Sequence, residues 1–273
     1  MRPNPLPLAV CLRTNLVQAP PFLLGTVVFG SLAMFASLFD KHGRLQHRIA
    51  RIWAQVSVWS SGSRVQIIGL ENIPIAVNAP GHEGEVDQVI GQLPNGKSEG
   101  QTCAVYAANH TSYMDTPVVF ASLPFQFRIL AKKELWNIPF IGWYLKRSGQ
   151  IPIDTANPRA TLSSLGNGVR ALRDGLSVFV FPEGGRTPNG HLQPFLNGAA
   201  YLAIRAQVPL VPIALVGVYD LLPIHTRHFY SSRTPLKLII GSPLLTHGRT
   251  LRESEALTEE LRQSIEALVE RYS

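Results

Sequence analysis

A run of twenty residues without a charged side chain, at positions 20–39, restricts how the N-terminal part of this chain can fold. As a helix it is long enough to cross the hydrocarbon core of a bilayer, and it is too apolar for an ordinary surface helix. A cleaved signal peptide and a buried core helix are the alternatives, but no clear cleavage site precedes the charges that follow. Those charges are mostly basic and comprise Asp40, Lys41, Arg44, Arg48 and Arg51. By the positive-inside rule we expect a membrane-associated helix, crossing or re-entering, whose downstream flank faces the cytoplasm.

Composition narrows the classes of partner. Hydrophobic residues make up 45% of the 273 positions and charged residues only 16%, which excludes a disordered chain. The formal net charge of +7 at pH 7 predicts an anionic partner, such as nucleic acid, a phospholipid surface or a phosphorylated metabolite. Two cysteines, Cys11 and Cys103, are too few for a disulfide framework or a cysteine-rich zinc site, and they favour a reducing compartment.

The chain divides into two regions. Apolar and aromatic residues recur at spacings of three and four over 43–60, which predicts an amphipathic helix. Such a helix could lie in the lipid headgroup layer or pack on the protein's own core, and the pattern suits both. We assign residues 1–62 to a membrane-anchoring helical region and residues 63–273 to one globular domain. A surface insertion at about 78–101 is rich in Gly, Pro, Asn and acids.

Short apolar runs alternate with helical patterns in the second region. Candidate strands lie at 64–69, 102–108, 127–131, 150–154, 176–181, 210–215 and 236–240. Helical patterns occupy 157–174, 195–206 and 251–272, and the first of them begins with the Asn-Pro pair of a helix start and ends before Gly175. This alternation predicts an α/β domain with a mixed, largely parallel sheet flanked by helices.

A polar segment, Asn-His-Thr-Ser-Tyr-Met-Asp at 109–115, leaves the carboxyl end of one predicted strand, where ligands bind in open α/β sheets. Asp115 follows His110 by five positions, so a helix starting nearby could return its carboxylate to the imidazole. One ring nitrogen would then donate to Asp115, and the other would be free to accept a proton from a hydroxyl. The pair is a candidate general base. A helix-capping Asp beside a surface His is the alternative, and the strand-end position is what favours catalysis.

A second polar segment, Phe-Pro-Glu-Gly-Gly-Arg-Thr at 181–187, follows another predicted strand. Gly184 and Gly185 let the backbone approach a ligand and offer N–H groups to an anion, and Arg186 adds a forked donor suited to phosphate. Glu183 fits such a site only if it binds a hydroxyl or orients the arginine. A tight turn with a solvated arginine is an equally good interpretation of this segment alone.

A third segment interleaves bases with aromatic residues, namely Lys132, Lys133, Trp136, Phe140, Trp143, Tyr144, Lys146 and Arg147. This mixture is typical of a membrane interface or of a platform for single-stranded nucleic acid. The apolar run at 20–39 favours lipid, so we expect a phospholipid membrane and no nucleic acid as partner. A solvated basic face over an ordinary core is the alternative.

Together these segments resemble the glycerolipid acyltransferase family, the 1-acylglycerol-3-phosphate acyltransferases. Four blocks occur in the family's order within residues 67–218. They are the His-x4-Asp box at 109–115, the pattern Lys132-x2-Leu135-x3-Pro139-x2-Gly142 leading to 149–154, the segment 181–187 and the segment 208–213. Two positions depart from the pattern: Thr155 stands where the family usually has arginine, and Gly185 where it often has threonine or serine.

The resemblance implies transfer of a fatty acyl group from coenzyme A or acyl carrier protein to the free hydroxyl of lysophosphatidate, giving phosphatidate without a cofactor or a metal. It makes His110 the general base and Asp115 the residue that orients it. It assigns the phosphate to Arg186 with the backbone of 183–185, and oxyanion stabilisation at the thioester to Lys132. Asn109 is a possible auxiliary residue, and so is Arg159, if its side chain reaches the phosphate in place of an arginine at position 155.

Three other functions fit parts of this pattern. The same base could acylate glycerol 3-phosphate or another lysolipid, and the motifs do not choose among these acceptors, between the two donors, or among acyl-chain lengths. His110, Asp115 and Glu183 could instead bind a metal for phosphoester hydrolysis. A non-catalytic lipid-binding protein is the third possibility, and an intact His110 and Asp115 pair argues against it.

Overall fold

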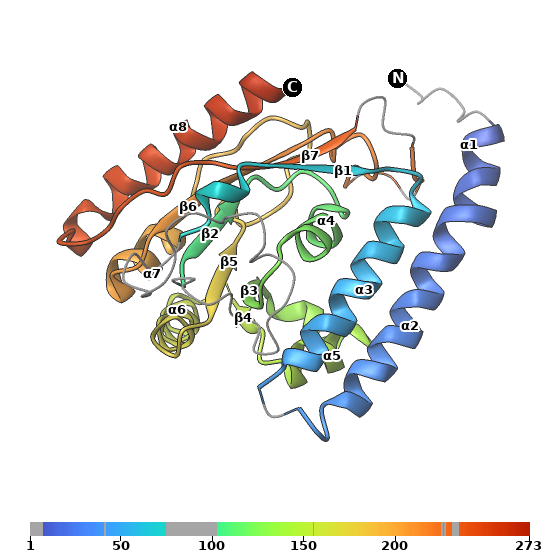
Figure 1. The fold of residues 1–273 in the computed structure, drawn as a ribbon, viewed down its shortest axis with the longest axis horizontal. Coiled ribbons are helices and arrows are strands. Elements are labelled where there is room, and N and C mark those ends of the chain that lie inside the picture. Colours follow the sequence, from blue (N-terminus) through green and yellow to red (C-terminus); the bar gives the residue numbers. More distant parts are fainter. Residues whose placement is uncertain are drawn as a thin grey trace, which may run out of the picture.

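A computed structural model of the chain, drawn in Figure 1, describes residues 8–40, 42–74, 103–154, 156–224, 226, 228–230 and 235–273. The insertion expected at about 78–101, and the departure from the family pattern at Thr155, lie outside these residues.

An N-terminal helical hairpin lies along one side of the molecule (Figure 1). Helix α1 (Leu8–Arg13) and a π-helical turn, η1 (Thr14–Gln18), lead directly into α2 (Ala19–Ala36), and α3 (Arg44–Ser60) returns beside α2. The side chains of Thr14 and Gln18 are buried and donate to the backbone oxygens of Phe229 and Ser61, over 3.2 and 3.1 Å. The Thr14 bond fastens the beginning of the hairpin to the rest of the fold, and the Gln18 bond joins it to the end of α3.

The hairpin leaves an apolar face uncovered. The buried residues of α2 are small, namely Gly25, Ala33 and Ala36. The helical segment Thr14–Ala36 is long and apolar enough to cross a membrane, and only 17% of its most apolar window is buried within the chain. One face of helix α3 packs on the core and includes small residues such as Ala54. Another face is open, where the Trp59 side chain is 77% exposed. The amphipathic pattern of α3 therefore serves the protein's own core on one side and leaves apolar groups outside it.

A seven-stranded sheet forms the centre of the remaining chain, in the order β1-β7-β6-β2-β5-β3-β4. Neighbouring strands are parallel except β6 and β7, which confirms the predicted mixed, largely parallel sheet. The strands are β1 (Val65–Ile68), β2 (Val105–Ala108), β3 (Phe127–Lys132), β4 (Ile151–Ile153), β5 (Ser177–Val180), β6 (Leu210–Val216) and β7 (Leu236–Ile240).

Helices cover both faces of the sheet (Figure 1). One face packs on α3 and α4 (Asp115–Ser122), and the other packs on α6 (Pro158–Arg173), α7 (Gly198–Ala206) and α8 (Ser254–Tyr272). Alternate residues of β2 accordingly enter different cores, with Tyr106 in the first and Val105 in the second. Strands buried on both faces need continuous apolar sequence, which explains the apolar runs. The described residues also form α5 (Ile141–Arg147) and the 3₁₀ turns η2 (Leu70–Asn72), η3 (Lys133–Asn137) and η4 (Leu251–Glu253).

The helix that we predicted at 195–206 begins at Gly198, three residues after the expected start. The backbone N–H of Leu196 donates to the oxygen of Pro182 over 2.8 Å, so this segment is held by the neighbouring turn and the helix starts at Gly198. The crossover helix is confirmed at its first turn, where the Asn157 side chain accepts from the backbone N–H groups of Arg159 and Ala160.

Gly142 of the second sequence block sits where no side chain fits. A Cβ atom there would lie 2.1 Å from the carbonyl oxygen of Trp136, and a backbone oxygen cannot rotate away. We expect Gly142→Ala to lower the free energy of unfolding by about 2–3 kcal/mol, as measured by urea denaturation. Gly166→Ala in α6 is the control, because its added methyl meets nothing within 4 Å and alanine favours the helix. Equal stability of the two variants would contradict the close approach at Gly142.

Candidate active site

His110 and Asp115 form a buried hydrogen-bonded pair at the carboxyl end of β2. Oδ2 of Asp115 accepts from Nδ1 of His110 over 2.8 Å and from the backbone N–H groups of Thr111 and Ser112 over 2.5 and 2.7 Å. The carboxylate is fully buried, whereas 12% of the His110 side chain is exposed. With Nδ1 donating to this fixed carboxylate, Nε2 is the nitrogen left to accept a proton.

The imidazole of His110 is also held by the segment 181–187. Its ring stacks on Phe181 with centroids 3.9 Å apart and planes inclined by 15°. The backbone oxygen of His110 accepts from the N–H of Thr187 over 2.8 Å. Burial lowers the pKa of His110 below its ordinary value, and the hydrogen bond to Asp115 opposes that shift. A lowered pKa keeps the imidazole neutral near pH 7, as a general base must be.

Glu183 braces the site through backbone groups. Its two carboxylate oxygens accept from the N–H groups of His110 and Gln193, over 2.6 and 3.0 Å. Burial raises the pKa of Glu183 to about 7. Neither oxygen bonds to Arg186, so the orienting role that its sequence position suggested is not seen; Arg186 instead donates to the backbone oxygen of Ser112.

The ligand set expected for a metal-dependent hydrolase is not formed. Nowhere in the described ranges do three His, Cys, Asp or Glu side chains group as metal ligands would. The Glu183 oxygens are taken by backbone donors, and Oδ2 of Asp115 accepts from His110.

His110 and Arg186 line one cavity although they lie 76 positions apart in the chain. The cavity has a volume of about 930 Å³, including the space at its open mouth, and Gly184, Gly185 and Lys132 also line it. Strand order explains this meeting, because β5 lies between β2 and β3 and all three are parallel. The carboxyl ends of these strands therefore share one edge of the sheet. The first sequence block follows β2, the second begins at the end of β3 and the third follows β5.

The two glycines of the third block differ in what they require. Gly184 has a φ of +69°, a conformation that calls for glycine, whereas the Leu196 side chain that a Cβ would approach is exposed and can move aside. Gly185 has room, since an added Cβ would come no closer than 3.9 Å, to Nζ of Lys132. The turn thus tolerates the side chain that the family often has at this position. Lys133, by contrast, pairs with Asp154 over 2.5 Å and does not line the cavity.

The two auxiliary residues do not line the cavity. The Asn109 side chain is buried and pairs with the backbone of Leu215, donating from Nδ2 over 3.0 Å and accepting at Oδ1 over 2.7 Å. It fastens the turn before His110 to β6. Arg159 is exposed in the first turn of α6 and is absent from the residues that line the cavity. The structure thus does not support Arg159 as a substitute phosphate ligand.

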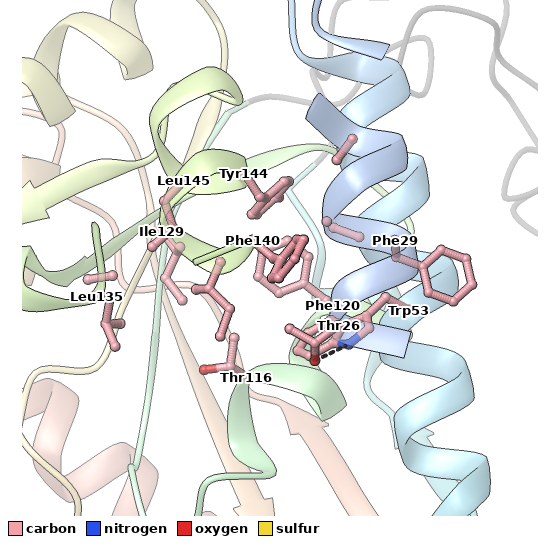
Figure 2. A pocket seen from close by; sticks show the side chains of 15 residues that line it. Thr26, Phe29, Trp53, Thr116, Phe120, Ile129, Leu135, Phe140, Tyr144 and Leu145 are labelled. Carbon is pink, nitrogen blue, oxygen red and sulfur yellow. Dashed lines mark hydrogen bonds between the residues drawn. The ribbon is translucent and has the colours of Figure 1, made fainter. Parts of the chain in front are cut away.

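A second, apolar cavity adjoins the first and was not anticipated from the sequence. Figure 2 shows it between α2, α3 and α5, with Thr26, Phe29 and Trp53 contributed by the hairpin. Its volume is about 740 Å³, including open space. Both cavities are lined by Thr116, Ile129, Ala131 and Leu135. The local hint was the presence of small residues, among them Gly30 and Ala33, in the apolar run.

The same part of the chain matches a known family. A model of the acyltransferase family matches residues 64–216, which hold the sheet from β1 to β6 and all four sequence blocks. The chain therefore belongs to the acyltransferase family.

Named relatives share one activity. The chloroplastic 1-acyl-sn-glycerol-3-phosphate acyltransferase of Arabidopsis thaliana is 30% identical over 245 residues, 89% of this chain and 59% of the relative. The Bacillus subtilis 1-acyl-sn-glycerol-3-phosphate acyltransferase is 33% identical over 169 residues, 60% of this chain and 80% of the relative. This chain spans about half to three fifths of the plant relatives, at 59% of the Arabidopsis protein and 48% of a Brassica napus protein.

A solved structure shares the fold. The crystal structure of the 1-acyl-sn-glycerophosphate acyltransferase PlsC from Thermotoga maritima superposes with a TM-score of 0.69 at 23% identity, covering 94% of this chain and 97% of that one. The similarity extends over nearly the whole of both chains, so it includes the helical hairpin as well as the sheet.

Proposed function

We propose that this protein transfers a fatty acyl group from an acyl thioester to the free hydroxyl of 1-acylglycerol 3-phosphate, giving phosphatidate. The observation that carries the proposal is that His110 and Arg186 line one cavity, which shares a wall with an apolar cavity. A base, an anion-binding group and an apolar pocket are what an acyl thioester and a phosphorylated alcohol require. The names of the relatives agree with this substrate pair.

Direct transfer accounts for the residues at the cavity. The acceptor oxygen attacks the thioester carbonyl carbon as Nε2 of His110 takes its proton, and the negative charge of Asp115 stabilises the imidazolium. The tetrahedral intermediate then collapses, the carbon–sulfur bond breaks, and the imidazolium returns the proton to the thiolate. Lys132 lines the same cavity and supplies positive charge for the oxyanion. No step needs a cofactor or an acyl-enzyme.

The acceptor's phosphate is assigned to Arg186 and the turn beside it. Two successive glycines leave the backbone of 184–185 open to a ligand, and the guanidinium offers a planar set of donors. This assignment fixes the order of groups along the cavity, with the phosphate at the 181–187 turn and the reacting hydroxyl at His110.

The apolar cavity is assigned to an acyl chain, and the hairpin to the membrane. A chain whose carbonyl lies at His110 would extend along the residues that line both cavities toward the side chains of α2 and α3, which Figure 2 shows. The exposed apolar face of α2 suits contact with lipid, which holds the acceptor. We accordingly place the 1–62 region at the membrane and the active site on its cytoplasmic side.

The test is an acceptor and donor panel. Purified protein in mixed micelles would receive long-chain acyl-coenzyme A or acyl carrier protein, with lysophosphatidate, glycerol 3-phosphate or lysophosphatidylcholine as acceptor. We expect thiol release and the mass of phosphatidate with lysophosphatidate, unchanged by a chelator of divalent ions. Phosphate release that the chelator abolishes, or lipid binding without turnover, would contradict the proposal.

Enlarging Ala131 should change the preference for acyl-chain length. Ala131 lines both cavities, so the extra atoms of Ala131→Leu take up space where the two cavities adjoin. We expect the ratio of kcat/KM for palmitoyl thioester to that for hexanoyl thioester to fall at least about tenfold, because each methylene kept out of the apolar cavity loses about 0.8 kcal/mol. Ala131→Ser is the control of similar size. An unchanged ratio in an active Ala131→Leu enzyme would assign the acyl chain elsewhere.

A further inference from the structure

The guanidinium of Arg186 lies over an aromatic ring. Its Cζ atom is 4.1 Å from the centroid of the Tyr113 ring. Its Nε donates to the backbone oxygen of Ser112 over 3.2 Å. These two contacts cover one face and one edge of the guanidinium. Among the residues that the structure describes, no acceptor bonds to the two terminal nitrogens, so they are left for a ligand in the cavity that Arg186 lines.

The backbone beneath Tyr113 is fixed by the segment that follows β6. The N–H of Tyr113 and the hydroxyl of Ser112 both donate to the oxygen of Leu222, over 3.3 and 2.9 Å. Ser112 also forms an isolated antiparallel bridge with Pro223. The ring of Tyr113 therefore stands on an anchored turn, and it can hold a neighbouring side chain in place.

Core packing does not explain why position 113 carries an aromatic side chain. Tyr113 is 43% exposed, whereas its neighbours Ser112, Met114 and Asp115 are fully buried. Its ring does not line either cavity. The contact with the guanidinium is thus the specific interaction that the structure gives this side chain.

Stacking of this kind has a consequence for binding. A free arginine side chain samples many rotamers, and ordering it on a ligand costs conformational entropy. A guanidinium already held over a ring and by a carbonyl has lost most of that freedom before the ligand arrives, so more of the interaction with an oxyanion appears as affinity. Attraction between the cation and the ring face adds to the restraint.

We propose that Tyr113 is a positioning residue for the acceptor: its ring holds Arg186 in the orientation that receives the phosphate of 1-acylglycerol 3-phosphate. The inference rests on the proposed function, since it takes that phosphate as the ligand of Arg186. Tyr113 itself acts through Arg186 and touches no reacting atom.

The experiment is a double-mutant cycle with a conservative control. Tyr113→Leu removes the ring face, Tyr113→Phe keeps it and removes only the hydroxyl, and Arg186→Gln removes the cation. We expect Tyr113→Leu to raise KM for lysophosphatidate about three- to tenfold, which is the size of effect expected from losing one cation–π contact. KM for the thioester and kcat should stay within about twofold of the wild-type values. Tyr113→Phe should match the wild type. Tyr113→Leu should have no further effect in the Arg186→Gln background.

The outcomes separate this inference from the proposed function. A wild-type protein that does not acylate lysophosphatidate contradicts the proposed function. An active wild type with an unchanged KM in Tyr113→Leu overturns only the role of Tyr113. So does an equal rise in KM with and without Arg186, because a general structural defect would give that result. Circular dichroism and thermal midpoints of the four variants, compared with the wild type, show whether each variant is folded, and the exposed position of Tyr113 favours folding.

Discussion

Replacing His110 with alanine is expected to lower kcat for acyl transfer by about 10²- to 10⁴-fold, the usual contribution of a general base. Without the imidazole, the acceptor hydroxyl must attack while still protonated or lose its proton to water. KM for both substrates should change little, because Arg186 and the apolar cavity remain. The measurement is single-turnover transfer of a radiolabelled acyl group to lysophosphatidate.

The fold should survive this substitution. Asp115 keeps the backbone N–H groups of Thr111 and Ser112 as donors when the His110 ring is gone. His191→Ala provides a matched control, because His191 is exposed and does not line the cavity. If His110→Ala retained more than about a tenth of the wild-type rate, His110 would not be the base.

Asp115→Asn should produce the second large loss, of about a hundredfold or more in kcat, with the fold intact. An asparagine oxygen at the Oδ2 position still accepts from Nδ1 of His110, and its amide can face the Thr111 hydroxyl, which lies 3.4 Å from Oδ1. The negative charge that stabilises the imidazolium is lost. A neutral partner therefore preserves the geometry and removes the electrostatic contribution.

The pH dependence of Asp115→Asn distinguishes this effect from misfolding. The hydrogen bond and the charge of Asp115 both raise the pKa of His110, so removing the charge should lower that pKa further. The base then stays unprotonated to lower pH, and the acidic limb of kcat/KM should move to lower pH while the plateau falls. A limb that moves to higher pH would show that Asp115 does not act on His110 by its charge.

Much of the fold was predictable because its signals are local. Each strand that is buried on both faces leaves an apolar run, and each crossover helix leaves a period and a cap, as at Asn157. The hydrogen bond between His110 and Asp115 was also predicted, from their position at the end of a strand, and the turn that joins them is made of the residues between them. Residues 195–197 were misassigned to a helix because the N–H of Leu196 bonds to the oxygen of Pro182, which lies in a turn distant in sequence.

Local sequence was enough to predict which side chains end each strand and that an apolar helix precedes them, since these depend on neighbouring residues. Long-range packing places β5 between β2 and β3, and this order brings Arg186 and Lys132 to the cavity of His110. It also turned Glu183 toward backbone donors, left Arg159 outside, and placed α2 against a cavity next to the site. The physical reason is that pairing and packing between distant segments are settled by the whole fold's buried surface and hydrogen bonds, which no local pattern records.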